Sequence, residues 1–195
     1  MPHISDVVKS QCAATLATRF SARRSTSLAA NKIKGETIME PRINYPKVAP
    51  GIIEAMLGLS KYLSKSGLEE SLLNLVDLRA SQINGCAFCI DMHRKDLRAA
   101  GETEQRLYGL DVWEESPYYS DRERAALAWT EAVTNIQEGH VPDRVYEQVR
   151  KFFTEKELAD LTLAITTING WNRLNIAMKT VAGTYQPARA HASKP

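Results

Sequence analysis

The chain has 195 residues, which is enough for one domain with a substantial buried core. Its 25 lysines and arginines against 23 aspartates and glutamates leave a formal net charge of +2, which excludes the strongly basic surface of proteins that bind nucleic acid or anionic membranes. No run of about 18 apolar residues occurs, so we expect no membrane-spanning helix. The three cysteines are too few for a disulfide scaffold, and we expect a cytoplasmic protein in which a C-x-x-C pair carries redox or metal chemistry.

Residues 1–38 differ in composition from the rest of the chain. They are rich in Ser, Ala, Thr and Arg, hold few acids and lack the apolar periodicity of a packed helix, so we expect disorder there. This composition is also typical of an organellar transit peptide. A further hypothesis is that translation begins at Met39, because Lys34-Gly35-Glu36 can be encoded by a strong bacterial ribosome-binding sequence. Residues 39–195 are then predicted to form one helical domain.

From Pro46 onward, apolar residues recur every three or four positions and no alternating strand pattern occurs, so an all-α fold is predicted. Gly, Pro and capping residues mark where the helices begin and end. The expected helices are 50–64, stopped by Gly67; 68–84; Cys86 to Ala100, ended by Gly101; 103–107, opened by Thr103; 122–136, with Asp121 as N-cap; 142–152, with Pro142 at N1; and a last long helix opened by a capping box of Thr154 and Glu157.

A weak internal repeat is found when residues 70–85 are laid over residues 155–170. Ile83-Asn84-Gly85 then falls on Ile168-Asn169-Gly170, and two helix-turn-helix units are implied. A duplication would have kept the packing in both copies and the reactive groups in one. At the positions of Cys86, Cys89 and His93, the second copy carries Trp171, Leu174 and Met178.

Cys86, Cys89 and His93 are the candidate catalytic residues. They lie at i, i+3 and i+7, which places them on one face of a helix. Gly85 breaks the preceding helix, so Cys86 is expected near a helix N-terminus, where free N–H groups and the helix dipole favour a thiolate. His93, one turn beyond Cys89, is placed to accept a thiol proton. Such a thiolate attacks a peroxide, becomes a sulfenic acid and is resolved to a disulfide, which an external dithiol must reduce.

Three other interpretations of the C-x-x-C compete with this one. Free cysteines are often small buried hydrophobes with no chemical role. A zinc site would need a further ligand beside the two cysteines and His93: Cys12 lies in the segment where we expect disorder, and His140 would have to be recruited. A thioredoxin fold lacks its βαβ context here. We therefore expect neither a metal nor an organic cofactor.

The segment from Leu78 to Cys89, LRASQINGCAFC, followed by His93, resembles the AhpD-like alkylhydroperoxidase branch of the carboxymuconolactone decarboxylase family. The likeness continues through residues 101–107, 123–130 and 168–173. The resemblance implies an AhpD-like all-helical fold with duplicated helical hairpins, assembled as a homo-oligomer (trimer or hexamer) with the redox site near a subunit contact. It also implies reduction of organic or hydrogen peroxide without a prosthetic group, by electrons from an external dithiol or thioredoxin-like reductant.

The resemblance assigns Cys89 as the peroxidatic cysteine, Cys86 as the resolving one and His93 to a proton relay. Helix-dipole reasoning alone favours Cys86 as the more acidic thiol, so the two arguments disagree, and we follow the family.

The chain departs from the family at one relay position. The glutamate that lies twelve residues before the first cysteine in those relatives is Asn74 here. An amide cannot accept and release a proton as a carboxylate does. Glu70 or Asp77 could replace it, but each is more typical of a solvated surface charge.

The predicted function is a thiol-dependent peroxidase. The first alternative is a dithiol redox sensor or relay that does not turn over peroxide. The second is a decarboxylase-type lyase acting on a cyclic acid, although that branch of the family works without the cysteine pair. Trp171, Asn172 and Arg173 are expected to serve packing and helix capping.

Overall fold

The computed structural model describes residues 39–187, and within this range no strand occurs, which confirms the all-α prediction. The expectations for residues 1–38 lie outside the described residues. No helix in the described part is long and apolar enough to cross a membrane. The elements are α2 (Tyr45–Val48), α3 (Pro50–Leu63), α4 (Glu70–Asn84), α5 (Ala87–Ala99), α6 (Glu104–Tyr108), the 3-10 turn η1 (Leu110–Val112), α7 (Asp121–Thr134), α8 (Asp143–Val149) and α9 (Glu155–Met178).

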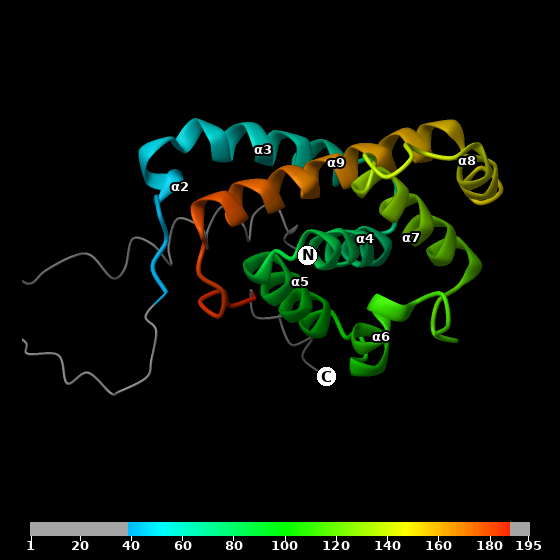
Figure 1. The fold of residues 1–195 in the computed structure, drawn as a ribbon, viewed down its shortest axis with the longest axis horizontal. Coiled ribbons are helices and arrows are strands. Elements are labelled where there is room, and N and C mark those ends of the chain that lie inside the picture. Colours follow the sequence, from blue (N-terminus) through cyan, green and yellow to red (C-terminus); the bar gives the residue numbers. More distant parts are fainter. Residues whose placement is uncertain (1–38, 188–195) are drawn as a thin grey trace, which may run out of the picture.

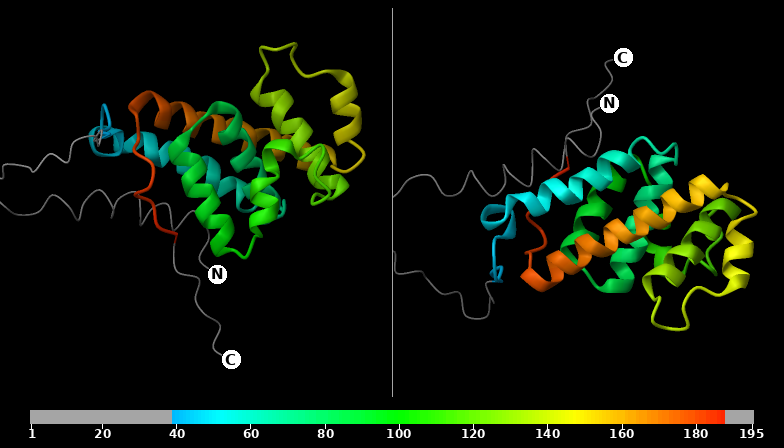
Figure 2. Two further views of the ribbon diagram at one scale, coloured as in Figure 1. Left: turned by 60° about the horizontal axis from the view of Figure 1, so that its bottom comes forward. Right: turned by 90° about the horizontal axis from the view of Figure 1, so that it is seen from above.

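Helices α4 and α9 form the centre of the fold. α4 packs against α5, α7 and α9, and α9 also packs against α3 and α7. Figure 1 shows α3 and α9 running side by side, with α4 and α5 next to them, and Figure 2 shows the same arrangement from two further directions. The four helices α3, α4, α5 and α9 thus surround one region of the molecule.

The core consists of two clusters of buried apolar side chains that meet on α4. One face of α4 packs against α7, α8 and α9, and the other against α5, α6, η1 and α7. Burial on both faces explains why α4 is rich in leucine. The fully buried members are Leu75, Val76, Leu78, Leu110, Ala126, Leu127, Val149, Leu161 and Ile165.

Most helix ends agree with the sequence analysis. The capping box of Thr154 and Glu157 is present at α9. At α7, however, Ser120 is the N-cap: its Oγ accepts from the Glu123 N–H at 3.3 Å, and the Glu123 carboxylate accepts from the Ser120 N–H at 2.8 Å. The predicted cap, Asp121, is the first helical residue instead. Pro142 is likewise the N-cap of α8 rather than its first residue. The short elements α2 and η1 were not expected.

The second helix-turn-helix unit differs from the expectation. α4 ends at Asn84, but α9 continues through Asn169 and Gly170 as one helix of 24 residues. The second turn that the repeat implied is therefore absent, whereas the predicted long last helix is confirmed. The aligned residues Asn84 and Asn169 nevertheless meet, because the Asn84 Nδ2 donates to the Asn169 Oδ1 at 2.9 Å.

Candidate active site

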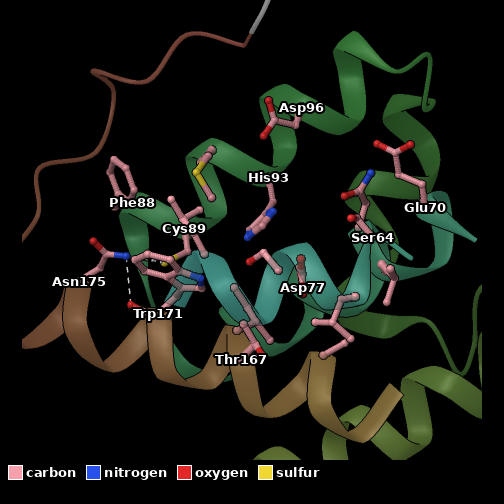
Figure 3. A pocket seen from close by; sticks show the side chains of 18 of the residues that line it. Ser64, Glu70, Asp77, Phe88, Cys89, His93, Asp96, Thr167, Trp171 and Asn175 are labelled. Carbon is pink, nitrogen blue, oxygen red and sulfur yellow. Dashed lines mark hydrogen bonds between the residues drawn. The ribbon is translucent and has the colours of Figure 1, made fainter. Parts of the chain in front are cut away.

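A cavity of about 250 Å³ lies between α3, α4, α5 and α9 (Figure 3). Most of its wall is apolar, which is the usual character of small-molecule sites. Its polar groups come mainly from α4, α5 and the C-terminal half of α9. The apolar residues that line it are Leu57, Leu63, Leu68, Leu73, Phe88, Met92, Ala164, Ile168 and Trp171.

The two cysteines lie at the start of α5, next to this cavity. Cys86 is the N-cap residue, and its Sγ accepts a hydrogen bond from the Cys89 N–H at 3.3 Å. The two side chains form a disulfide, with 5.3 Å between their Cα atoms. Both are only 1% exposed, but of the two only Cys89 lines the cavity. A reactant that enters the cavity therefore meets Cys89 first, with Cys86 directly behind it.

The position of Cys86 is fixed by how α4 ends. Gly85 adopts a left-handed conformation with φ of 69°, which costs little only for glycine. The Gly85 N–H donates to the Gln82 carbonyl at 3.1 Å, and the Cys86 N–H donates to the Ser81 carbonyl at 3.0 Å. These are the two bonds of a Schellman cap. The predicted break at Gly85 and the predicted place of Cys86 at a helix N-terminus are confirmed.

A buried polar network joins this turn to α9. The Asn84 Nδ2 donates to the Asn172 Oδ1 at 2.9 Å, and the Asn172 Nδ2 donates to the Ser81 Oγ at 3.0 Å. The Ser81 hydroxyl in turn donates to the Asp77 carbonyl at 2.7 Å. Asn172 is completely buried, so its contribution is a set of hydrogen bonds that holds the cysteine-bearing turn, rather than helix capping.

Asn175 is a site residue that the sequence analysis missed. Its Nδ2 lies 3.6 Å from the Cys89 Sγ, and its Oδ1 accepts a hydrogen bond from the Tyr45 hydroxyl at 3.2 Å. Both residues are buried and line the cavity. A donor held next to the sulfur favours the thiolate form of Cys89 when the disulfide is open. No motif in the sequence marks Asn175, because α9 carries several asparagines and only the fold brings this one to Cys89.

His93 lies one turn beyond Cys89, as predicted, and lines the same cavity. Its ring points toward α4, the helix that carries Asp77 (Figure 3). The Nε2 atom is buried and has no hydrogen-bond partner in the described structure. Burial lowers the pKa of His93 to about 4, so the imidazole is neutral at pH 7 and can accept a proton.

Asp77 is not the solvated surface charge that the sequence analysis expected. Its side chain lines the cavity, and the described structure gives its carboxylate no hydrogen bond or ion pair. Burial raises the pKa of Asp77 to about 7, because the charged form loses its hydration. Asn74, one turn earlier, is buried and also lines the cavity, whereas Glu70 is exposed at its edge.

Asp96 is a second acid that lines the cavity, and it is half-buried. Burial raises its pKa to about 6, although a hydrogen bond from the Tyr185 hydroxyl at 2.6 Å works in the opposite direction. Tyr185 belongs to the segment after α9, which returns to α5. The Lys95 Nζ donates to the Tyr185 carbonyl at 3.0 Å, and the Gly183 N–H donates to the Asp91 carboxylate at 3.0 Å. The C-terminal segment therefore covers the outer side of α5.

Within residues 39–187, no group of three or more His, Cys, Asp and Glu side chains is arranged to hold a metal ion. His140, considered as a zinc ligand, lies in the loop between α7 and α8 with a positive φ of 61°, and is not among the cavity residues. Cys12 lies outside the described residues. Trp113 and Trp129 are buried in the two core clusters, away from the cavity.

Comparison with known proteins identifies relatives of this chain. Residues 50–132 match the model of the carboxymuconolactone decarboxylase family. The uncharacterized protein YdfG of Bacillus subtilis is 45% identical over 140 residues, 72% of this chain and 95% of YdfG. An Agrobacterium tumefaciens protein of unknown function, named as a candidate AhpD antioxidant defence protein, is 44% identical with a TM-score of 0.71 over 73% of this chain and 98% of that one.

The debrominase Bmp8 shares the fold at 20% identity, with a TM-score of 0.62 over 71% of this chain and 75% of its own. The residues matched by the family model include α3, α4 and α5, three of the helices that build the cavity. The chain belongs to the carboxymuconolactone decarboxylase family, in its AhpD-like branch, and has the all-helical fold of that branch.

Proposed function

We propose that the protein is a thiol-dependent peroxidase that reduces organic peroxides through Cys89 and Cys86, with His93 as the base. The observation that carries the proposal is the position of Cys89. It lines an apolar cavity, is joined to Cys86 behind it, and has His93 one turn beyond it. Membership of the AhpD-like branch supports a peroxidase-related role in the same direction.

The first step consumes the peroxide. In the reduced protein His93 accepts the Cys89 thiol proton, and the Asn175 amide donates to the resulting thiolate. The thiolate attacks the outer oxygen of the hydroperoxide, so that an S–O bond forms and the O–O bond breaks. Cys89 is left as a sulfenic acid, and the organic group leaves as an alkoxide that takes up a proton to become an alcohol.

The second and third steps restore the thiols. The Cys86 thiol attacks the Cys89 sulfenic acid, water leaves, and the disulfide seen in the structure forms. An external dithiol or thioredoxin-like protein then attacks the disulfide at Cys89, and Cys86 leaves as a thiolate and gains a proton. The second thiol of the reductant displaces Cys89, so the reductant ends as a disulfide.

We propose that Asp77 is the acid that donates a proton to the alkoxide. Its raised pKa of about 7 leaves a substantial protonated fraction at neutral pH, and its carboxyl lines the same cavity as Cys89 and His93. Asn74 cannot take this role, since an amide does not release a proton at neutral pH. The proton removed from Cys89 returns to Asp77 through His93, so the cycle is balanced.

On family grounds we further propose a homo-oligomer, trimer or hexamer, in the cytoplasm. The mass of the native protein measured by light scattering tests the oligomer. A monomer at micromolar concentration would contradict it.

The function is tested by peroxide consumption with purified protein, cumene hydroperoxide and a dithiol. We expect turnover in wild type and in Cys12→Ser, and none in Cys89→Ser or Cys86→Ser. A disulfide that forms and is reduced reversibly without turnover would identify a redox sensor or relay instead. Activity on a cyclic acid that persists in the double cysteine variant would identify a lyase.

A further inference from the structure

The charged groups around the cavity all have the same sign. Glu70, Asp77 and Asp96 line it, whereas no lysine or arginine among residues 39–187 does. The other titratable groups that face it are Tyr45 from α2 and Cys89 and His93 from α5, and α3 and α9 contribute only apolar or uncharged polar side chains. Above pH 6, where His93 is neutral, the cavity therefore carries only negative charge.

None of these three carboxyl groups is neutralised by a cation. No ion pair in the described structure involves Glu70, Asp77 or Asp96, and the partner of Asp96 is the uncharged hydroxyl of Tyr185. Asp91, on the outer side of the same helix α5, shows the contrast, because it forms an ion pair with Lys95 at 2.8 Å. The acids without an ion pair thus line the cavity, whereas Lys95 is bound to Asp91 outside the cavity.

A reactant that carries its own carboxylate would meet two costs there. Its charge would lose hydration without finding a cation, and it would lie within a few ångströms of other carboxylates in a medium of low dielectric constant. An uncharged apolar reactant meets neither cost, and the apolar wall favours it. Unpaired like charges are a recognised means of excluding a competing ligand.

We propose that Glu70, Asp77 and Asp96 make the cavity select against negative charge, so that uncharged apolar hydroperoxides and uncharged dithiols reach Cys89 while their carboxylate-bearing analogues do not. The hydroperoxide half of this inference rests on the proposed function, and the dithiol half does not. Both reactants enter in their protonated forms, and the dithiol gives up a thiol proton inside the cavity, where the Nε2 of His93 is buried without a partner.

The selection depends on pH in a defined direction. Burial raises the pKa of Asp96 to about 6 and that of Asp77 to about 7, so both carboxyls lose their protons between about pH 5.5 and pH 8. The negative charge of the cavity rises over this interval. The exclusion of carboxylates must therefore be weaker at pH 5.5 than at pH 8.

The first experiment uses a matched pair of reductants, dihydrolipoamide and dihydrolipoate, which differ only in an amide against a carboxylate. The rate at which each opens the Cys86–Cys89 disulfide is followed by stopped-flow fluorescence of Trp171, which lines the cavity, and by thiol labelling of quenched samples. We expect dihydrolipoamide to react about 10-fold faster or more at pH 8, and the ratio to fall toward pH 5.5. Equal rates, or a ratio independent of pH, would overturn the inference.

Variants then identify the source of the selection. Asp96→Asn and Asp77→Asn remove one acid each with little change in shape, and each should lower the ratio of the two rates by about 3-fold. Glu147→Gln is the matched control, because it removes an exposed acid of α8 far from the cavity and should leave the ratio unchanged. An unchanged ratio in both aspartate variants would overturn the assignment to these carboxyls.

A second pair separates the inference from the proposed function. Cumene hydroperoxide carrying a para carboxylate is compared with its methyl ester, and we expect the ester to have the higher kcat/KM by about 10-fold. Turnover of both at equal kcat/KM would overturn the inference and leave the peroxidase standing. No turnover of either, together with discrimination between the two dithiols, would contradict the peroxidase and support the selection.

Discussion

The tripeptide Ile-Asn-Gly occurs twice in the chain, and the two copies have different structures. At residues 83–85 it ends α4 and is followed by the cysteine pair, whereas at residues 168–170 it lies within α9. The asparagine behaves alike in both copies: the Asn84 Nδ2 donates to the Ala80 carbonyl and the Asn169 Nδ2 to the Ile165 carbonyl, each at 2.9 Å. The difference therefore arises at the glycine.

Gly85 has open space around it and a left-handed backbone, while Gly170 is helical and lies against Met56 of α3. A Cβ on Gly170 would lie 3.1 Å from the Met56 Cε. In the second copy, glycine serves the close approach of two helices; in the first, it lets the chain turn. In the first copy the turn creates a new helix N-terminus at Cys86, and this copy bears the reactive groups. In the second copy α9 continues without a turn and supplies part of the cavity wall and the amide of Asn175.

The largest expected effect tests whether the reactive groups lie in the first copy alone. Cys89→Ser should reduce peroxide turnover to the uncatalysed rate, since no nucleophile remains in the cavity. Cys86→Ser should allow a single oxidation of Cys89 and then stop, because nothing resolves the sulfenic acid. Met178→Ala, at the position in the second copy that aligns with His93, should retain turnover; its loss there would place chemistry in α9 as well.

Asn172 connects the two copies, and its removal should cost the most stability. Asn172→Ala leaves the Asn84 amide and the Ser81 hydroxyl short of a buried partner, and we expect a loss of about 3 kcal/mol in the free energy of unfolding. Urea denaturation measures it. Glu147→Ala, at an exposed position of α8 that takes no part in these hydrogen bonds, is the control and should change stability by less than about 1 kcal/mol. Equal effects of the two substitutions would show that the network contributes no more than a surface residue.

Asp77, in the first copy, makes the stability of the protein depend on pH. The second copy has no such group, since Thr162 stands at the aligned position. The Asp77 folded-state pKa of about 7 lies above the ordinary aspartate value of 3.8, so the folded protein holds this proton more tightly and loses stability as pH rises from about 4 to 7. Asp77→Asn removes this loss. Relative to wild type, the variant should gain about 4 kcal/mol of stability between pH 4 and pH 8.

Thermal unfolding of both proteins from pH 4 to pH 8 is the measurement. His93 acts in the opposite direction, because its pKa is lowered to about 4 and it costs stability as pH falls below 6.5. That contribution is common to wild type and Asp77→Asn and cancels in their difference. A difference that stays constant with pH would contradict the buried, unpaired state of Asp77.

Substitutions of the two glycines, Gly85 and Gly170, should have the smallest effects on stability, and they compare the two copies most directly. Gly85→Ala forces a Cβ into a left-handed backbone and should lower the free energy of unfolding by about 1–2 kcal/mol. Gly170→Ala gains helix propensity but displaces the flexible end of Met56, so we expect a net change within about 0.5 kcal/mol. Chemical denaturation of the two variants compares them. A larger loss at Gly170 would reverse our account of the two sites.

Much of the fold could be predicted from the sequence, because apolar periodicity and capping residues are local signals. The start of α5 at Cys86, its end before Gly101 and the capping box of α9 all follow from such signals. The second helix-turn-helix unit that the repeat implied is absent for a physical reason: identical local sequence turns or continues according to what packs against the glycine, and Met56 is more than a hundred residues away in the chain.

The site was predictable only in part for a similar reason. Cys86, Cys89 and His93 lie in one segment with helical spacing, so the sequence brings them together. The contribution of Asn175 depends on α9 crossing the start of α5, and that of Asp77 on a cavity formed by four helices. Burial of a carboxyl is a tertiary property, and Asp77 is indistinguishable in the sequence from an exposed acid.

The central claim is that Cys89, facing the cavity, is the thiol that attacks the peroxide. It is tested most directly by trapping the sulfenic acid with dimedone in Cys86→Ser and in Cys89→Ser, each also carrying Cys12→Ser and treated with one equivalent of cumene hydroperoxide. Mass spectrometry of the peptides should find the adduct on Cys89 in the first protein and little or none on Cys86 in the second. An adduct that forms as fast or faster on Cys86 would contradict the account and assign the attack to the N-cap thiol.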